Sequence, residues 1–108
     1  MPKTEYLQGV LDLLILKTLE LSPNHGWGIQ QRIRLVSRES LSVSQGSLYP
    51  ALHRLEAAGL VSSEMTPSNN NRRARVYRLT AAGRRRLEAE TEDWRAFSLG
   101  IRRLLQQN

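Results

Sequence analysis

Residues 44–83 read SQGSLYPALHRLEAAGLVSSEMTPSNNNRRARVYRLTAAG, and the spacing of their apolar residues changes partway through. Three leucines in the first part recur at i, i+4 and i+7, as on one face of a helix: Leu48, Leu52 and Leu55. Pro50 lacks an N–H and is tolerated in a first turn, so the helix is predicted to begin near Gly46 or Ser47, with a serine as its cap. Gly59 is predicted to end it.

The second part of this stretch is predicted to be extended. Residues 60–65 and 73–79 form two candidate strands, and residues 66–72 between them contain one proline, one serine and three asparagines, which are turn residues. Alternation along the second strand turns the arginines near its tip and Tyr77 near its base to one face. We therefore predict a helix followed by an antiparallel hairpin whose tip is rich in arginine and asparagine.

The distribution of charge favours a polyanionic partner. The chain carries 16 Lys and Arg against 10 Asp and Glu, a net charge of +6, which attracts nucleic acid but also membranes and acidic proteins. Seven arginines and no acidic residue lie between Arg72 and Arg86, whereas four acidic residues lie between Glu88 and Asp93. A charge run is usually a solvated face. Here part of the basic run lies on the predicted hairpin, which favours a binding surface.

Some classes of protein are disfavoured by what the sequence lacks. A chain of 108 residues predicts one domain with a modest core, and the absence of cysteine fits a cytoplasmic protein. The apolar run at 10–16 contains Asp12 and is too short to cross a bilayer. We find no glycine-rich phosphate loop, no convergent pair of carboxylates and no usable Ser, His and Asp set, so we expect neither an enzyme nor a bound cofactor.

The remaining segments predict helices with more apolar surface than one small core covers. Residues 9–21 are apolar nearly all round, which indicates a core on one side and a second subunit on the other. Helix breakers at 22–26 separate them from a second helix at 27–38. Thr80 is predicted to cap a last helix that reaches about residue 106 and has apolar residues near heptad spacing. We therefore expect a homodimer whose interface includes Leu11, Ile15, Leu87, Trp94, Ile101 and Leu105.

The order helix, helix, helix, strand, strand, helix is that of a winged helix-turn-helix with one appended helix. The fold is thus predicted to be mainly α with a small two-stranded antiparallel wing. We expect a DNA-binding domain at 1–80 and a C-terminal dimerisation helix at 81–108, which together form one compact unit. The third helix of such a fold enters the major groove of double-stranded DNA, and the wing reaches a phosphate or the minor groove. On this basis we place two sets of residues near DNA: Gln45, Ser47, Tyr49 and His53 on the helix, and Arg72, Arg73 and Arg75 on the wing.

Some of these assignments have structural alternatives. Tyr49 is either a DNA contact or a surface aromatic packed on the wing. His25 and His53 lack acidic or cysteine neighbours at ligand spacing, so we expect no metal, a structural or capping role for His25, and a surface or phosphate role for His53. A winged helix also serves for contact with protein or RNA in some proteins, because a fold does not fix a function.

Four segments carry a resemblance to a known family: YLQGVLDLLILKTLE (6–20), HGWGIQQRI (25–33), GSLYPALHRLEAAGLV (46–61) and NRRARVYRLTAAGRRRL (71–87). They resemble the PadR family of winged helix-turn-helix transcriptional regulators, and GSLYPALHRLE together with YRLTAAG is specific to it. The resemblance implies a bacterial or archaeal dimeric regulator, often a repressor, that binds an inverted-repeat operator and is released by a small molecule. It also implies DNA contacts from Ser47, Tyr49, Pro50 and the wing arginines, and a dimer formed by the first and last helices, as in the short subfamily.

Trp94 has two interpretations. Its place on the apolar stripe of the last helix is typical of interface core. In similar short PadR regulators an aromatic of this helix lines a pore between subunits, so Trp94 and Phe97 are also candidates for binding a planar, apolar or cationic small molecule.

The chain departs from the family pattern at Trp27, where tyrosine is more common, and at Val76, where an aromatic is common. We interpret both departures as changes in packing.

Overall fold

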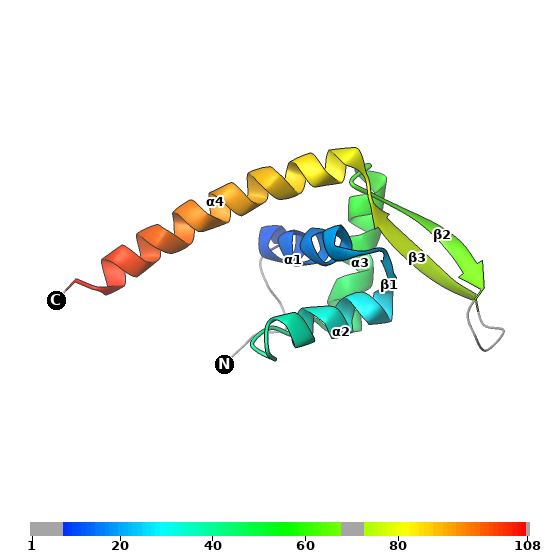
Figure 1. Cartoon of the computed structure of the whole chain (residues 1–108), viewed down its shortest axis with the longest axis horizontal. Coiled ribbons are helices and arrows are strands. Elements are labelled where there is room, and N and C mark those ends of the chain that lie inside the picture. Colours follow the sequence, from blue (N-terminus) through cyan, green and yellow to red (C-terminus); the bar gives the residue numbers. More distant parts are fainter. Residues whose placement is uncertain (1–7, 68–72, 108) are drawn as a thin grey trace.

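The computed structural model describes residues 8–67 and 73–107, which form four helices and a small antiparallel sheet (Figure 1). The elements in chain order are α1 (Gln8–Leu21), β1 (Asn24–His25), α2 (Gly26–Val36), α3 (Gln45–Ala57), β2 (Val61–Pro67), β3 (Arg73–Leu79) and α4 (Ala81–Leu105). The long helix α4 projects beyond the other elements, and the molecule measures 59 × 29 × 21 Å. Within the described residues, no helix is long and apolar enough to cross a membrane.

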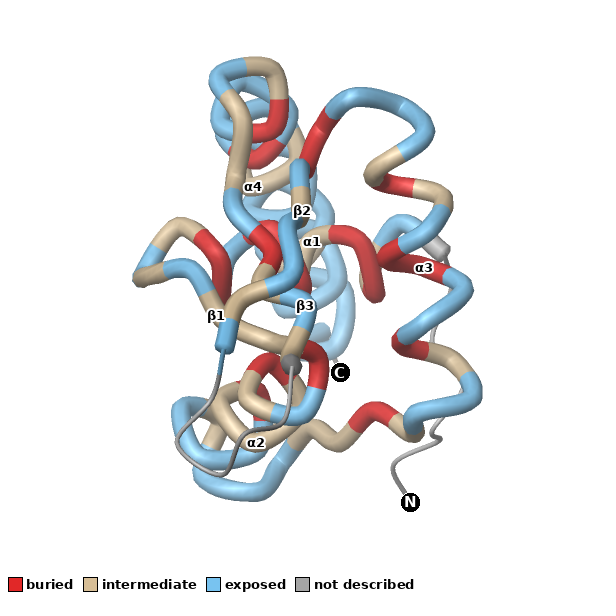
Figure 2. Tube along the Cα trace, turned by 90° about the vertical axis from the view of Figure 1, so that its right-hand side faces the viewer, coloured by how far each residue is buried: buried red, intermediate tan, exposed pale blue. Residues whose placement is uncertain are grey.

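The core is built around α1, which packs against α2, α3, β3 and the first part of α4 (Figure 1). Ile15 and Leu16 of α1 are fully buried, as are Ile29 of α2 and Leu48 and Leu52 of α3. Figure 2 shows the buried segments of these helices lying where the elements meet. Burial of each such side chain contributes about 1.5–3 kcal/mol to folding. Neighbours within the same chain therefore explain much of the all-round apolar character of residues 9–21.

The sheet has the strand order β1–β3–β2, with both pairs antiparallel. The hairpin of β2 and β3 confirms the predicted wing, although β2 extends to Pro67. The short strand β1 was not predicted, because its two residues lie in a cluster of helix breakers and are defined only by their pairing with β3, where Asn24 lies opposite Tyr77. This pairing attaches the wing to the start of α2.

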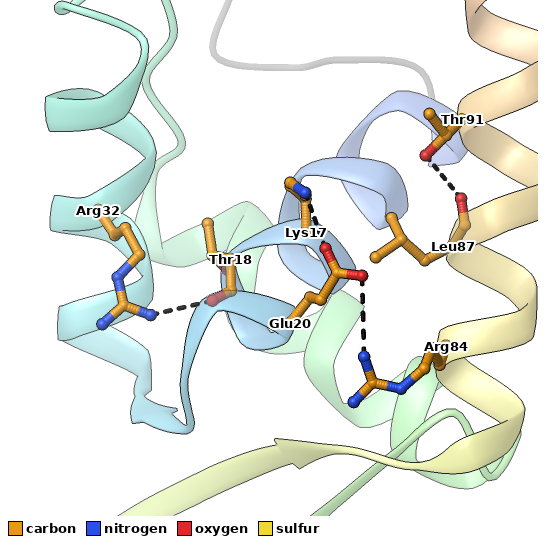
Figure 3. A network of polar contacts seen from close by, with 7 residues as sticks. All are labelled: Lys17, Thr18, Glu20, Arg32, Arg84, Leu87 and Thr91. Carbon is orange, nitrogen blue, oxygen red and sulfur yellow. Dashed lines mark hydrogen bonds and ion pairs between the residues drawn. The ribbon is translucent and has the colours of Figure 1, made fainter.

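Polar contacts join α1 to the helices on either side of it (Figure 3). Arg32 of α2 donates from Nη1 to the carbonyl oxygen of Thr18 at 2.9 Å. The carboxylate of Glu20 accepts a hydrogen bond from Lys17 at 2.7 Å and lies 3.8 Å from the guanidinium of Arg84 on α4. The hydrogen bond from Lys17 lowers the pKa of Glu20, and the positive charges of Lys17 and Arg84 act in the same direction.

The caps of α3 and α4 agree with the predicted ones, whereas the argument from Pro50 does not hold. Ser44 accepts a hydrogen bond from the N–H of Ser47 and caps α3, and Thr80 caps α4. The helix α3 therefore begins at Gln45, and Pro50 lies in its second turn, not in its first. The missing N–H of Pro50 deprives only the carbonyl of Gly46 of a partner, and both residues are exposed to water.

Candidate nucleic-acid interface

One face of α3 is exposed along its whole length. The opposite face carries four buried residues that hold the helix on the core: Leu48, Ala51, Leu52 and Leu55. Gln45, Tyr49 and His53 follow one another at intervals of four, so they share the exposed face. Pro50 is exposed next to them, and Ser47 is half-buried beside the cap. The structure thus brings together all five residues that the sequence analysis selected on this helix.

Tyr49 is both packed and accessible. Its phenol lies against Gly26 at the start of α2, where an added Cβ would be 2.4 Å from Tyr49 Oη. Only glycine leaves room for the ring at this position. Tyr49 remains 37% exposed. The packing partner that the structure identifies is therefore α2, and one edge of the ring is available for contact with a ligand.

The wing is tied to α3 through a chain of two hydrogen bonds. Arg75 of β3 donates from Nη1 to Ser63 Oγ of β2 at 3.0 Å. Ser63 in turn donates to Glu56 Oε2 of α3 at 2.7 Å. These bonds hold the exposed guanidinium of Arg75 at a fixed position relative to the helix.

The other wing arginines are less fully described. Arg72 lies outside the described residues. Arg73 opens β3, where its backbone lies opposite Pro67. Arg78 has its guanidinium 3.5 Å from a carboxylate oxygen of Glu64 on β2. Of the three predicted wing contacts, Arg75 is therefore the one whose side chain the structure places.

Tyr77 anchors the base of the wing. It is buried, with 2% of its surface exposed, as the alternation of β3 predicts. Burial raises the pKa of its phenol, the nearby Glu56 and Tyr49 raise this pKa further, and Arg75 opposes them. The base of the wing is therefore held by the buried Tyr77, whose phenol stays uncharged at neutral pH.

His25 and Trp27 also reach the surface here, and sequence reasoning missed Trp27. Trp27 is 57% exposed, so the change from tyrosine does not alter the core. Its ring stacks on His25, with centroids 6.2 Å apart. His25 caps α2, because its Nδ1 accepts the N–H of Gly28 at 3.0 Å. Residues two positions apart on a helix point to nearly opposite sides, so a core position for Ile29 predicts that Trp27 is exposed. Among the described residues, no group of three or more His, Cys, Asp or Glu side chains is arranged to hold a metal.

A second surface lies between α1 and α4. An apolar groove of about 460 Å³ is lined by Gly9, Val10, Leu13, Glu90, Asp93, Trp94 and Phe97. The rings of Trp94 and Phe97 have centroids 5.7 Å apart and planes tilted by 44°. Trp94 is 43% exposed and Phe97 59%. Both predicted ligand residues therefore face the same groove.

The residues predicted for the dimer interface fall into two groups. Leu11, Ile15 and Leu87 are buried in the core of the single chain and have almost no surface to offer a second copy. The exposed group is Trp94, Ile101 and Leu105. The heptad spacing of α4 runs from the part packed on α1 to the part that projects beyond it (Figure 1). The apolar stripe of α4 therefore packs in the core at its beginning and is exposed in the part that follows.

A helix with an exposed polar face, a helix before it, a basic hairpin and a long last helix define a winged helix-turn-helix protein. Residues 15–89 match the model of the transcriptional regulator PadR-like family. The chain belongs to this family, whose members regulate transcription by binding DNA and are not enzymes. The resemblance inferred from the four sequence segments is thus confirmed.

Individual relatives agree with this assignment. Over 101 residues the chain is 42% identical to the transcriptional regulator Rv3488 of Mycobacterium tuberculosis, a match that covers 94% of this chain and 88% of the relative. A solved transcriptional regulator from Clostridium thermocellum superposes with a TM-score of 0.83 at 26% identity, covering 92% of this chain and 96% of the other. A PadR-like transcriptional regulator from Bacillus cereus superposes with a TM-score of 0.80 at 26% identity, covering 94% and 97%.

Proposed function

We propose that this chain is a sequence-specific, double-stranded DNA-binding repressor that acts as a homodimer and is released from its operator by a small molecule. The observation that carries the proposal is the exposed face of α3, which presents Gln45, Tyr49 and His53 and to which hydrogen bonds tie the basic wing. A rigid polar helix next to a positive hairpin matches the two grooves and the phosphates of a duplex.

Each side chain on this surface has a chemistry suited to DNA. The amide of Gln45 pairs bidentately with adenine, and the hydroxyl groups of Ser47 and Tyr49 bond to base edges or phosphates. The wing guanidinium groups attract the phosphates and supply the salt-dependent part of the affinity. The full set of proposed DNA contacts is Gln45, Ser47, Tyr49, Pro50, His53, Arg72, Arg73 and Arg75.

The dimer is proposed to form through α4 and the adjoining side of α1. Six apolar residues on the outer part of α4 are between 40% and 76% exposed: Trp94, Phe97, Leu99, Ile101, Leu104 and Leu105. A second copy of the same helix would remove this apolar surface from water. In this arrangement residues 1–80 contact DNA, and residues 81–108 set the distance between the two copies.

The charges of α4 favour an antiparallel pair of helices. Acidic residues between Glu88 and Asp93 precede a basic segment that contains Arg95, Arg102 and Arg103. Two antiparallel copies bring the acidic segment of one helix to the basic end of the other, whereas two parallel copies align like charges.

The groove between α1 and α4 is proposed as the effector site. Trp94 and Phe97 supply aromatic walls, and the carboxylates of Glu90 and Asp93 are among its lining residues. Planar apolar molecules suit such walls, and a positive charge on the molecule suits the carboxylates. Because α1 forms one side of the groove and also packs on α3, an occupant that displaces α1 also displaces the DNA-reading helix.

The test is a selection of random duplex oligonucleotides by the purified full chain near physiological salt, followed by sequencing of the recovered DNA. A two-fold dimer is expected to enrich an inverted repeat with half-sites about 34 Å apart, one helical turn of the duplex. Enrichment of a single half-site would remove the dimer from the proposal but keep the DNA reader. Recovery of no preferred sequence would contradict sequence-specific binding.

A further inference from the structure

An aromatic pair, the half-buried His25 and the exposed Trp27, lies between the two elements proposed to contact DNA. The backbone of His25 pairs with Val76 of the wing strand β3. Gly26, between the two aromatic residues, lies directly against the phenol of Tyr49 on α3. We infer that Trp27 and His25 contact the sugar-phosphate backbone of the duplex beside α3. This inference rests on the proposed DNA-binding function and adds two contacts to it.

The large exposed area of Trp27 indicates that a ligand covers this side chain. A tryptophan side chain carries a large apolar area and is usually well buried, yet Trp27 is 57% exposed. Its ring is not loose on the surface, because it stacks on the imidazole of His25 with an interplanar angle of 18°. His25 is itself fixed by its hydrogen bond to Gly28. Both rings are therefore held in place before any ligand arrives.

The hydrogen-bonding groups of the pair match phosphate. Because His25 Nδ1 accepts the N–H of Gly28, the proton of the neutral imidazole is on Nε2, which is then a donor. The indole Nε1 of Trp27 is a donor only. The pair thus offers two N–H donors, and phosphate oxygens only accept. The major-groove edge of guanine also presents two acceptors, so the choice of phosphate rests on the place of the pair in the fold.

The place of the pair in the fold agrees with a backbone contact. In helix-turn-helix proteins the helix before the reading helix crosses the phosphate backbone while the reading helix lies in the major groove. Trp27 is on α2, which is that helix. Both proposed donors are uncharged, so they release no counterions. Their contribution should therefore be equal for all sequences and should not depend on salt.

Two substitutions test the inference. Trp27→Phe keeps a flat ring to stack on His25 but has no N–H. His25→Ser keeps a capping oxygen that accepts the N–H of Gly28 but is too short to place a donor at the position of Nε2. Each is expected to weaken binding by about three- to tenfold, the effect of one hydrogen bond. The factor should be equal for the selected duplex and an unrelated duplex, and the salt dependence should not change. Leu35→Ala, at the other end of α2 and at a residue 71% exposed, should bind as the unsubstituted chain does.

Tryptophan fluorescence gives an independent readout. The chain contains two tryptophans, and Trp27→Phe leaves only Trp94, near the middle of α4. Addition of duplex DNA is expected to change the emission of the unsubstituted chain much more than that of Trp27→Phe. If both variants bind DNA with unaltered affinity, the inference is wrong and the DNA-binding function stands. If the unsubstituted chain binds no duplex, both the function and the inference are wrong.

Discussion

Asp12 of α1 and Arg54 of α3 form an ion pair that links the two helices across the interior of the fold. Asp12 is only 6% exposed, while the side chain of Arg54 reaches the surface beside α3 and is 38% exposed. The residues on either side of Asp12 in the helix include Val10 and Leu13, which line the groove between α1 and α4. The pair therefore joins α1, which forms one side of the proposed effector groove, to the proposed DNA-reading helix by a direct charged contact.

Loss of Arg54 should destabilise the fold. Arg54→Ala leaves the carboxylate of Asp12 buried without its partner, and we expect a loss of about 1–3 kcal/mol in the free energy of unfolding. The double variant Asp12→Leu with Arg54→Met should recover most of this loss, because no charge is then left buried. Urea unfolding at equal chain concentrations measures both effects. Equal stability of Arg54→Ala and the unsubstituted chain would mean that water replaces the guanidinium at no cost.

Arg75 should contribute to DNA binding mainly through its charge. Arg75→Ala is expected to reduce the slope of log affinity against log salt concentration by about one unit, the release of one phosphate counterion. The loss should be similar for all duplexes. Lys17→Ala removes an equal charge from α1, where Lys17 pairs with Glu20, and should leave the slope unchanged. A mobility-shift titration over a salt series makes the comparison, and an unaltered slope for Arg75→Ala would remove this side chain from the contact.

Features set by a few adjacent residues could be predicted from the sequence. The caps Ser44 and Thr80 and the end of α3 depend on local chemistry, and Gly59 indeed has a positive φ of 77°. The shared face of Gln45, Tyr49 and His53 follows from the period of that one helix, whereas the proposed contact of Pro50 follows from the family resemblance. Pro50 led to a predicted start of α3 one or two residues too late, because this proline lies in the second turn, where its missing N–H affects only the exposed carbonyl of Gly46.

Features that depend on distant partners could not be predicted. The strand β1 exists because β3 lies beside it, and two residues carry no pattern of their own. Leu11 and Ile15 are apolar in the sequence whether their neighbour is the same chain or a second copy, so periodicity alone did not reveal that α2, α3 and α4 cover them. The exposure of Trp27 follows from the position of Ile29, but an apolar residue next to a helix start is easily assigned to the core.

The exposed end of α4 should hold the dimer together. Replacement of Ile101 and Leu105 by aspartate is expected to give monomers that lose operator affinity, because each monomer then reads only one half-site. Val36→Asp is the matched control, since Val36 is 66% exposed on α2 and lies outside the proposed interface. Sedimentation velocity gives the oligomeric state, and mobility shifts give the affinity. Dimers with normal operator affinity in the double variant would exclude this part of α4 from the interface.

The aromatic walls of the groove should bind planar molecules. In a Trp27→Phe background Trp94 is the remaining tryptophan, so the tryptophan emission comes from this groove residue alone. A panel of planar aromatic amines, added without DNA, is expected to quench it, and Phe97→Ala should weaken that binding about fivefold or more. The same compounds should release DNA from the chain that retains both side chains. Emission that no compound alters, together with undisturbed DNA binding, would contradict an effector site at Trp94.

Tyr77 should make the fold sensitive to alkaline pH. Burial raises the pKa of its phenol above 10.0 in the folded chain, so the folded state holds this proton more tightly than the unfolded state. The resulting stability is fully present below the unfolded pKa of about 10 and is lost as the pH rises through the raised value. Urea unfolding between pH 7 and pH 11 should therefore show the unsubstituted chain losing stability more steeply than Tyr77→Phe above about pH 10. Tyr49→Phe, which alters a phenol that is 37% exposed, should retain the steep loss. Parallel curves for Tyr77→Phe and the unsubstituted chain would mean that the phenol has the same pKa in the folded and unfolded chain. This outcome would contradict a pKa raised by burial beside Glu56.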